Sequence, residues 1–468
     1  MNLGFPLSIL SPIHPIVLCV ITVAVYFGAF VGVFHYDDSL TVLENPHLES
    51  WQIFVGHLDH MVRPVLYATF LLDHWLYGTA PAGYHLLNVL LHLGSGLLIY
   101  RILTSVVSDD GSPVPFLTAL VFLIHPIATE TVTYISGRAS GLMAFFYLLA
   151  FFFYNKASEQ PENVKARRLY LLGAVAAFLF AIGSKETAVT LPLILLLWDV
   201  IVRGLKGRSL HAARHAPFWI VVVLAAAWAW SHPRYTALAQ FSLGIRPPWD
   251  NLLSELHVLA YALGLFFTPW NQNFDHDLPV LHSPTQWPLP FDLGLFVGAV
   301  VASILLVRRL SLVSFGLAWF LIQLLPTTLI PRNDLLSERN LYLPAIGLLL
   351  AIVSLGWHLV QWLLVIVRRP VHVRTGSAVL ATALIVVLCL FTYQRNLLYQ
   401  DRFLLWSDAV AKSPNKARPH NNLGRAYALR GDWDRAIEEF RRAAGLDPDF
   451  IIARQNLRDA YLHHVGRQ

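Results

Sequence analysis

Charged residues are scarce in this chain. Lysine, arginine, aspartate and glutamate together make up 13% of its 468 residues, whereas hydrophobic residues make up 56%. Soluble globular domains carry roughly 25% charged residues, and the mean hydropathy of this chain is +0.54. So few charges exclude an ordinary soluble protein, and the sequence predicts a membrane protein with many spans.

Cysteines and the common catalytic motifs are also scarce. The two cysteines, Cys19 and Cys389, lie inside apolar runs and do not indicate a disulfide framework. The sequence contains no glycine-rich phosphate loop, no nucleophile elbow and no paired metal motif. The net charge of +5 is spread over several basic loops and does not form one groove-binding surface, so no nucleic-acid partner is expected.

Apolar runs of suitable length predict eleven membrane-spanning helices. They lie near residues 15–34, 84–100, 114–128, 139–155, 168–183, 187–203, 216–231, 293–307, 312–330, 340–366 and 377–394. Four basic clusters orient the chain, because lysine and arginine accumulate in cytoplasmic loops. The clusters are Lys156, Lys165, Arg167 and Arg168; Arg203, Lys206, Arg208 and Arg214; Arg308 and Arg309; and Arg368, Arg369 and Arg374. This pattern predicts a cytoplasmic N-terminus and a non-cytoplasmic C-terminus.

Two apolar segments do not fit as spans. Residues 252–268 contain Glu255 and His257, and a span there would place the later basic loops on the wrong side. Residues 63–80 mix large apolar side chains with charged ones such as Arg63. The first segment is therefore predicted to be an interfacial or re-entrant helix, and the second an amphipathic helix that lies on the membrane.

The composition changes after residue 394, where charges become frequent and apolar runs stop. The spacing from residue 417 onward predicts a tetratricopeptide repeat, a 34-residue helix–turn–helix unit. The residues that fit it are Leu423, Gly424, Tyr427, Ala436, Phe440, Ala443 and Pro448. The chain thus divides into a membrane domain at 1–394 and a repeat domain at 395–468. The repeats bind an acceptor, mediate dimerisation or cap the structure; their sequence leaves these roles open.

An acid pair, Asp37 and Asp38, stands where the first apolar run ends. Neighbouring carboxylates at a membrane surface repel each other and are partly dehydrated, so such a pair indicates a functional site. A carboxylate there can act as a general base toward an acceptor hydroxyl and can stabilise a developing positive charge. The alternative is a pair that caps a helix or lies in a loop.

Three cations lie at other predicted outer helix ends: Arg138, Lys185 and Arg339. Arginine offers a bidentate fork and lysine a point charge, so together they can hold a lipid phosphate. The alternative is that each extends to lipid headgroups. A separate external acid–histidine cluster that can bind a cation comprises Asp275, His276 and Asp277.

Five further polar residues accompany these groups. Glu186 and Glu338 each stand beside a cation, so ion pairing and catalysis are both open. His125 and Glu130 lie where a span meets the outside, and Tyr342 begins a later span. His125 either contacts substrate or has a structural role. All five are predicted to bind substrate or to support the residues that do.

These motifs, taken in order, resemble those of the transmembrane-and-tetratricopeptide (TMTC-type) O-mannosyltransferases and their bacterial relatives. The motifs are Tyr36-Asp37-Asp38-Ser39 with Asn45, His125-Pro126 with Glu130 and Gly137-Arg138, Ser184-Lys185-Glu186 with Pro192, Ser337-Glu338-Arg339 with Leu341-Tyr342-Leu343-Pro344, and Pro414-Asn415-Lys416 before the repeats. The resemblance covers nearly the whole chain. It implies an all-α GT-C membrane fold and inverting sugar transfer on the non-cytoplasmic face, from a polyprenyl-phosphate sugar.

The resemblance also implies roles for individual residues. The acid of the first external loop, Asp37 or Asp38, acts as the base, and the sugar is mannose or another hexose. A divalent cation is an open alternative, but no metal ligand is assigned. The expected partners are membrane lipid, the lipid-linked donor and a protein or glycan acceptor, and the expected location is a bacterial inner membrane with its active site facing the periplasm. The competing functions are a non-catalytic scaffold that recruits partners through its repeats and a transporter of polyprenyl lipids.

Overall fold

The computed structural model describes residues 12–107, 111–160, 162–205, 212–367 and 370–465. Every regular element within these ranges is a helix, as the sequence predicts. Four basic residues used for the topology prediction, namely Lys206, Arg208, Arg368 and Arg369, lie outside the described residues.

Eight helices of the described part are long and apolar enough to cross a membrane. They are His14–Val31 (α2 with η1), Pro81–Thr104 (α5), Ile135–Ser158 (η6 with α8), Val164–Ser184 (α9), Ala212–Ser231 (α11), Ser311–Leu329 (α15), Tyr342–Ile366 (α16) and Pro370–Leu398 (α17). A ninth is formed if α6 (Val114–Ile124) and the following Pro126–Thr133 (η5 with α7) count as one span, although they bend by 53°.

The structure supports eight or nine full-length spans in its described residues, not the eleven predicted from the sequence. One of the two missing runs is α14 (Leu289–Leu305), whose 17 residues are short for a span. The other is interrupted: it forms η7 (Glu186–Thr190), α10 (Leu191–Leu197) and η8 (Trp198–Val202) in succession. Hydropathy alone does not show such breaks in helical geometry. The number of spans predicted from the sequence is therefore higher than the number of full-length spans in the structure.

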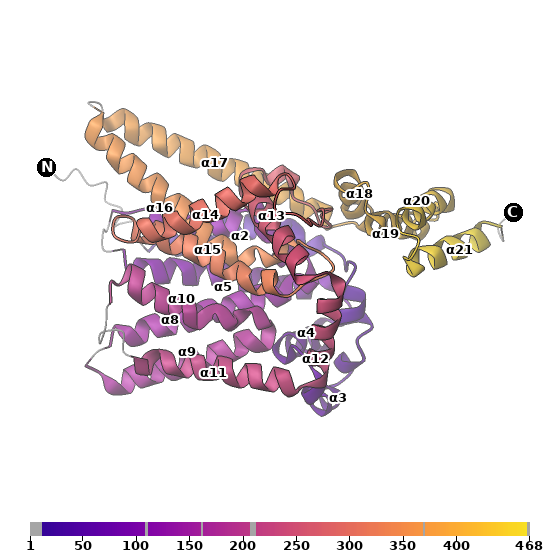
Figure 1. Cartoon of the computed structure of the whole chain (residues 1–468), viewed down its shortest axis with the longest axis horizontal. Coiled ribbons are helices and arrows are strands. Elements are labelled where there is room, and N and C mark those ends of the chain that lie inside the picture. Colours follow the sequence, from indigo (N-terminus) through magenta and orange to yellow (C-terminus); the bar gives the residue numbers. More distant parts are fainter. Residues whose placement is uncertain (1–11, 108–110, 161, 206–211, 368–369, 466–468) are drawn as a thin grey trace.

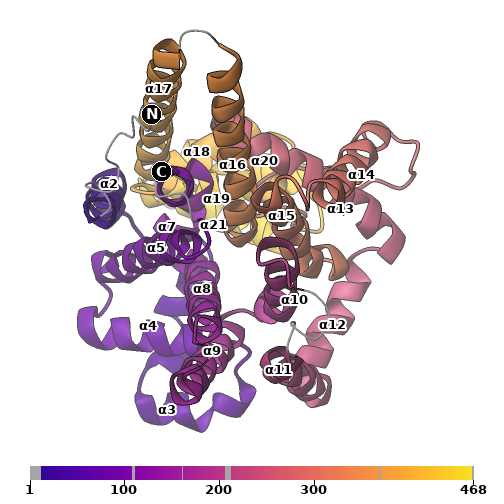
Figure 2. The same cartoon turned by 90° about the vertical axis from the view of Figure 1, so that its left-hand side faces the viewer.

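Several helices outside the spans gather at one end of the bundle. They are α3 (Trp51–Gly56), α4 (Pro64–Tyr77), α12 (Pro233–Ile245) and α13 (Pro248–Phe267). Figure 1 shows α3, α4 and α12 at the same end as the C-terminal repeat helices. In the end-on view of Figure 2, α12 crosses from the side of α11 to that of α13. The helices α4 and α13 correspond to the two segments predicted to be interfacial, and neither qualifies as a span.

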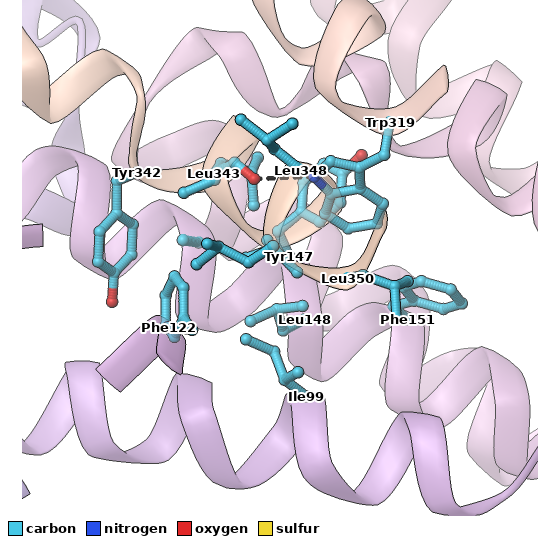
Figure 3. Close-up of a cluster of buried hydrophobic side chains, with 14 of the residues drawn as sticks. Ile99, Phe122, Tyr147, Leu148, Phe151, Trp319, Tyr342, Leu343, Leu348 and Leu350 are labelled. Carbon is cyan, nitrogen blue, oxygen red and sulfur yellow. Dashed lines mark hydrogen bonds between the residues drawn. The ribbon is translucent and has the colours of Figure 1, made fainter. Parts of the chain in front are cut away.

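The core of the membrane domain is a cluster of large aromatic and aliphatic side chains from α5, α8, α15 and α16 (Figure 3). The Trp319 indole Nε1–H donates a 2.8 Å hydrogen bond to the Leu343 carbonyl and stacks on Phe151. The helices α15 and α16 approach closely at Gly316 and Gly347, where a Cβ on either residue would overlap the other's carbonyl oxygen. This packing fixes the segment just before α16, which carries the Ser337–Tyr342 motif.

The C-terminal repeat unit consists of α18 (Arg402–Lys412), α19 (Ala417–Leu429), α20 (Trp433–Leu446) and α21 (Ile451–Val465). Phe440 of α20 lies against Gly424 of α19, where a Cβ would lie 2.7 Å from the ring. Tyr427 packs on the same seam, as its place in the repeat predicts. The preceding helix α17 continues to Leu398, so the last membrane helix extends beyond the predicted domain boundary at residue 394.

Candidate functional site

The acid pair lies in the turn that follows η1, and its two carboxylates have different environments. Asp38 is completely buried: Oδ2 accepts from the His35 amide at 2.8 Å, and Oδ1 accepts from the Ser136 amide at 2.8 Å and from the Ser136 hydroxyl. Burial, opposed by these hydrogen bonds, raises the pKa of Asp38 to about 7. The Asp37 side chain is 38% exposed, and its nearest charged partner is Arg339. Asp38 therefore holds the turn together, and Asp37 is the carboxylate that can reach a ligand.

Tyr36, next to the pair, adopts the left-handed region with φ of 34°. A bulky residue rarely adopts this conformation, and such strain persists only where surrounding contacts enforce it. Here the ring of Tyr36 meets Trp406 edge-on, and the Arg418 guanidinium carbon lies 5.4 Å from the ring centre. Both partners belong to the repeat unit, so that unit contacts the turn that presents Asp37.

Arg339 brings a third segment to the acid pair. Its guanidinium Nη2 lies 3.6 Å from Asp37 Oδ2, and its Nε lies 3.7 Å from Glu130 Oε1. Glu130 is buried and also accepts hydrogen bonds from the Arg339 amide at 3.0 Å and the Ser337 hydroxyl at 2.8 Å. Glu130 thus fixes the turn that places Arg339 beside Asp37.

Lys185 is buried beside Arg339, and no carboxylate among the described residues pairs with it. Its Nζ donates to the Ser140 hydroxyl at 2.7 Å and to the Asn340 amide oxygen at 2.8 Å. Burial and the neighbouring arginine charges lower the pKa of Lys185 well below its usual value. An anion placed here would favour the protonated amine. Lys185 and Arg339 line a common pocket, which we call the anion pocket.

Glu186 is the partner of Arg63. The two Glu186 oxygens accept hydrogen bonds from Arg63 Nε at 3.0 Å and Nη2 at 2.6 Å, a bidentate pair that joins the start of α4 to η7. This structural ion pair is one of the two alternatives that the sequence leaves open. It also keeps a second guanidinium close to Lys185, whose pKa it helps to lower.

Arg138 does not reach the other two cations, so the prediction that three cations converge is wrong in this respect. Its guanidinium is completely buried and lies 2.6 Å from Asp73 Oδ2. It also donates to the Asn88 side chain at 2.7 Å and the Tyr84 carbonyl at 2.8 Å, and it covers the Phe70 ring at 4.6 Å. Arg138 therefore holds α4 against α5 and α8 and is not free to bind a phosphate.

Three other predicted residues face the protein interior. Both ring nitrogens of His125 bond to the backbone: Nδ1 accepts from the Ile127 amide, and Nε2 lies 3.2 Å from the Phe266 carbonyl. Tyr342 is buried, with its hydroxyl 2.7 Å from His92 Nδ1. Glu338 is also buried; it accepts from the Asn273 amide at 2.6 Å and from Arg395 at 2.8 Å. These contacts are structural, and none of the three side chains opens into the anion pocket.

The repeat unit is attached to the membrane domain by four charged residues, which we call the repeat seat: Asp275, Asp334, Lys416 and Arg418. Lys416 Nζ lies 2.7 Å from Asp275 and 3.1 Å from Asp334, and Arg418 donates to the same two carboxylates at 2.6 and 2.7 Å. The next residue, His276, pairs with Glu338 at 2.9 Å. Asp275 and His276 are thus occupied by protein partners and do not form the cation site suggested by the sequence; the described residues contain no cluster of three or more His, Cys, Asp or Glu side chains suited to a metal.

Replacement of Arg418 by Gln is expected to loosen the repeat seat. Two carboxylates lose a charge-assisted partner, which costs roughly 1.5–3 kcal/mol for each such hydrogen bond. Amide hydrogen exchange in residues 271–277 should then accelerate by about tenfold or more. The matched control is Arg441→Gln, because Arg441 bonds only to Tyr461 within the repeat unit. Equal exchange in the two variants would show that the seat does not hold the unit.

Some residues of this region escaped prediction from the sequence. Asn340 and Ser140 orient Lys185 through hydrogen bonds. A neutral polar residue beside a charged motif does not by itself indicate a function. Arg332 lines a second pocket next to the anion pocket, and Glu255 lines it as well. A weak signal existed for Glu255, since it is an unexplained acid in an apolar run. The repeat pattern also suggests Asn421, Asn422 and Arg425 as residues available to an acceptor. The two asparagines are buried, whereas Arg425 is exposed.

Comparisons with known proteins agree with the motifs. The family model of the tetratricopeptide repeat matches residues 417–450. Protein O-mannosyl-transferase F38B6.6 of Caenorhabditis elegans is 22% identical over 93% of this chain and 63% of its own length. Human Protein O-mannosyl-transferase TMTC1 is 26% identical over 92% of this chain and 55% of its own length. The chain therefore spans only about half to two thirds of these relatives.

A solved structure is also similar. The crystal structure of ArnT from Cupriavidus metallidurans bound to undecaprenyl phosphate superimposes with a TM-score of 0.45 and 13% identity, over 88% of this chain and 80% of that one. The resemblance that the motifs predict is confirmed by the curated relatives: over more than nine tenths of its length, this chain is similar to the TMTC-type O-mannosyltransferases.

Proposed function

We propose that this protein is a membrane glycosyltransferase that moves a hexose from a polyprenyl-phosphate donor to an acceptor hydroxyl, with inversion at the anomeric carbon. The observation that carries the proposal is the exposed Asp37 carboxylate, 3.6 Å from Arg339 at the anion pocket. A candidate base and a candidate phosphate-binding cation thus lie close enough to act on one donor and its acceptor. The naming of the relatives as O-mannosyl-transferases favours mannose as the hexose.

In the proposed reaction, Asp37 accepts the proton of the acceptor hydroxyl as its oxygen bonds to the anomeric carbon. The bond between that carbon and the phosphate oxygen breaks, and polyprenyl phosphate leaves with the electron pair. Asp37 suits this role because its carboxylate is exposed, whereas every oxygen of Asp38 is already hydrogen-bonded. Asp38 and Ser136 then act as positioning residues for the turn.

The anion pocket suits the phosphate of the donor. Lys185 and Arg339 supply two cations. Lys185 is buried and Arg339 is partly buried, and removal from water strengthens their attraction for an anion. The guanidinium of Arg339 lies 3.6 Å from the Asp37 carboxylate and 3.7 Å from the Glu130 carboxylate. Both distances are longer than a hydrogen bond, so the guanidinium can reorient toward a phosphate. We exclude Arg138 from this role because its donors are occupied.

We further propose that the site faces the non-cytoplasmic side, in a bacterial envelope the periplasm. The basic loops at 156–168 and 308–309 favour this orientation through the positive-inside rule. The acceptor is then a protein or glycan outside the cytoplasm, held near Asp37 by the repeat unit. Neither a metal nor another cofactor has a role in this scheme.

The test is sugar transfer by the purified full-length protein, reconstituted with polyprenyl-phosphate mannose or glucose and an envelope extract as acceptor. Arg339→Lys keeps the charge but loses the bidentate fork, so the donor KM should rise by about 10- to 100-fold. Arg339→Gln should weaken the donor further. The control is Arg435→Lys, on an exposed surface of the repeat unit. Unchanged donor KM in both Arg339 variants would remove Arg339 from the phosphate site, and no transfer by the parental protein would contradict the proposed function.

A further inference from the structure

A second pocket lies beside the anion pocket and has no role in the reaction described so far. It is lined by α13, the C-terminal part of α15 and residues 332–341. Glu255 and Arg332 supply its charged groups, and leucines supply most of its apolar wall.

Glu255 is a buried acid without a partner. The residue is only 7% exposed, and no hydrogen bond or ion pair reaches its carboxylate from the residues that the structure describes. Burial raises the pKa of Glu255 to about 7, although the nearby Arg332 and Arg246 oppose this shift. A buried polar group without a partner is costly, by about 1–3 kcal/mol or more for a charged group. Its position on a pocket wall indicates that a ligand supplies the missing hydrogen bonds.

The rim of this second pocket is held rigidly. Arg246 donates to the Asn251 side-chain oxygen at 3.1 Å and also to the Arg332 carbonyl. Asn251 in turn donates to the Thr328 carbonyl at 2.7 Å. These bonds connect the end of α12 and the start of α13 to the last turn of α15 and to Arg332, which follows it. A preformed pocket of this kind loses little entropy on binding.

The two pockets are neighbours that share a wall. Thr327 and Asn340 line both of them, and the Asn340 side-chain oxygen accepts the hydrogen bond from Lys185 Nζ. A ligand with one anionic group and one adjacent ring can therefore contact the linings of both pockets. The anionic group would lie by Lys185 and the ring by Glu255.

The charges of the second pocket restrict the chemistry of that ring. Two guanidinium groups near Glu255 disfavour a cation, and the carboxylate disfavours a second anion. A neutral ring with several hydroxyls fits, because a carboxylate accepts hydrogen bonds from two hydroxyls and a guanidinium donates to ring oxygens. The leucines can cover the apolar face of such a ring.

We propose that this second pocket binds the sugar ring of the lipid-linked donor and that Glu255 is a specificity-determining residue that accepts hydrogen bonds from the sugar hydroxyls. The inference rests on the proposed function, since it takes the anion pocket as the site of the donor phosphate. It adds a binding site for the part of the donor that distinguishes one hexose from another.

The test separates the sugar from the phosphate by equilibrium binding to the full-length protein in nanodiscs. The three probes have the same prenyl chain: polyprenyl phosphate, polyprenyl-phosphate mannose and polyprenyl-phosphate glucose. In the parental protein, at least one sugar-bearing lipid should bind about tenfold or more tightly than the bare phosphate. Glu255→Gln should abolish this advantage and leave the affinity for bare polyprenyl phosphate unchanged. The control, Asp250→Asn, changes an acid of the same helix that pairs with His282.

Each other outcome has a distinct meaning. If the sugar-bearing lipids bind the parental protein no better than the bare phosphate, the sugar pocket is wrong and the phosphate site remains. If Glu255→Gln or Glu255→Ala lowers the affinity for all three lipids equally, Glu255 supports the anion pocket or the fold and does not recognise the sugar. If none of the lipids binds the parental protein, the proposed function fails, and the sugar pocket fails with it.

Discussion

Replacement of Asp37 by Asn is expected to lower the turnover of sugar transfer by about 100- to 10,000-fold, the usual effect of losing a general base. Asparagine has the same shape but cannot take the proton of the acceptor hydroxyl. Because the Asp37 side chain contributes one contact to Arg339 at 3.6 Å, the fold and donor binding should change little. Turnover with saturating donor, the donor KM and the melting temperature measure these three effects separately.

Asp38→Asn is the informative comparison for this prediction. The side-chain nitrogen of the new asparagine would have to face the backbone N–H of either His35 or Ser136, both of which donate to the Asp38 carboxylate in the parental protein. One buried donor would then lack an acceptor, so Asp38→Asn should lower the melting temperature along with activity. The assignment of the base to Asp37 is contradicted if Asp37→Asn retains parental turnover, or if Asp38→Asn loses turnover at unchanged stability.

Replacement of Arg138 by Gln should have the largest effect on stability. It leaves Asp73 as a buried acid without its cation, and such a change typically costs 3–5 kcal/mol. Unfolding in detergent should show this loss, whereas donor affinity of the folded fraction should stay near parental because Arg138 lies outside the anion pocket.

Two variants check this interpretation of Arg138. The double variant Arg138→Gln with Asp73→Asn should recover part of the lost stability, since the uncompensated acid is gone. Arg101→Gln, on an exposed part of the same neighbouring helix α5, should change stability by less than about 0.5 kcal/mol. Selective loss of donor binding by Arg138→Gln, at parental stability, would instead support the phosphate role that the sequence suggests.

The comparison of Arg138 with Arg339 shows what sequence patterns can and cannot predict. Both are arginines near predicted outer helix ends and within similar motifs, so they look equivalent. Their difference depends on partners that lie far along the chain: Asp73 neutralises Arg138, whereas Arg339 meets Asp37 and Glu130 loosely. Hydropathy and repeat spacing predict the helices because these are local properties, but pairing between helices is a property of the packed structure.

The second pocket illustrates the same limit. Glu255 is visible in the sequence as an acid in an apolar run, which correctly argues against a span. Only the packing of α13 against the end of α15 shows that Glu255 lines a pocket with Arg332 and that no described residue forms a hydrogen bond or ion pair with its carboxylate. Likewise, the sequence predicts the repeat unit but not its seat, whose charges come from three separate segments.

If the protein transfers sugar as proposed and its repeats hold the acceptor, the repeat seat restricts which acceptor positions receive sugar. Only Tyr399 to Asp401 connect α17 to α18, and Arg402 is bonded to the Phe34 carbonyl at 3.0 Å, close to the acid pair. The repeat surface therefore does not move on a flexible tether. A chain held on that surface presents its hydroxyls to Asp37 at one set distance along its length. Modified serines and threonines should accordingly lie at a constant separation from the bound segment. Glycine residues inserted between α17 and α18 should make that separation variable.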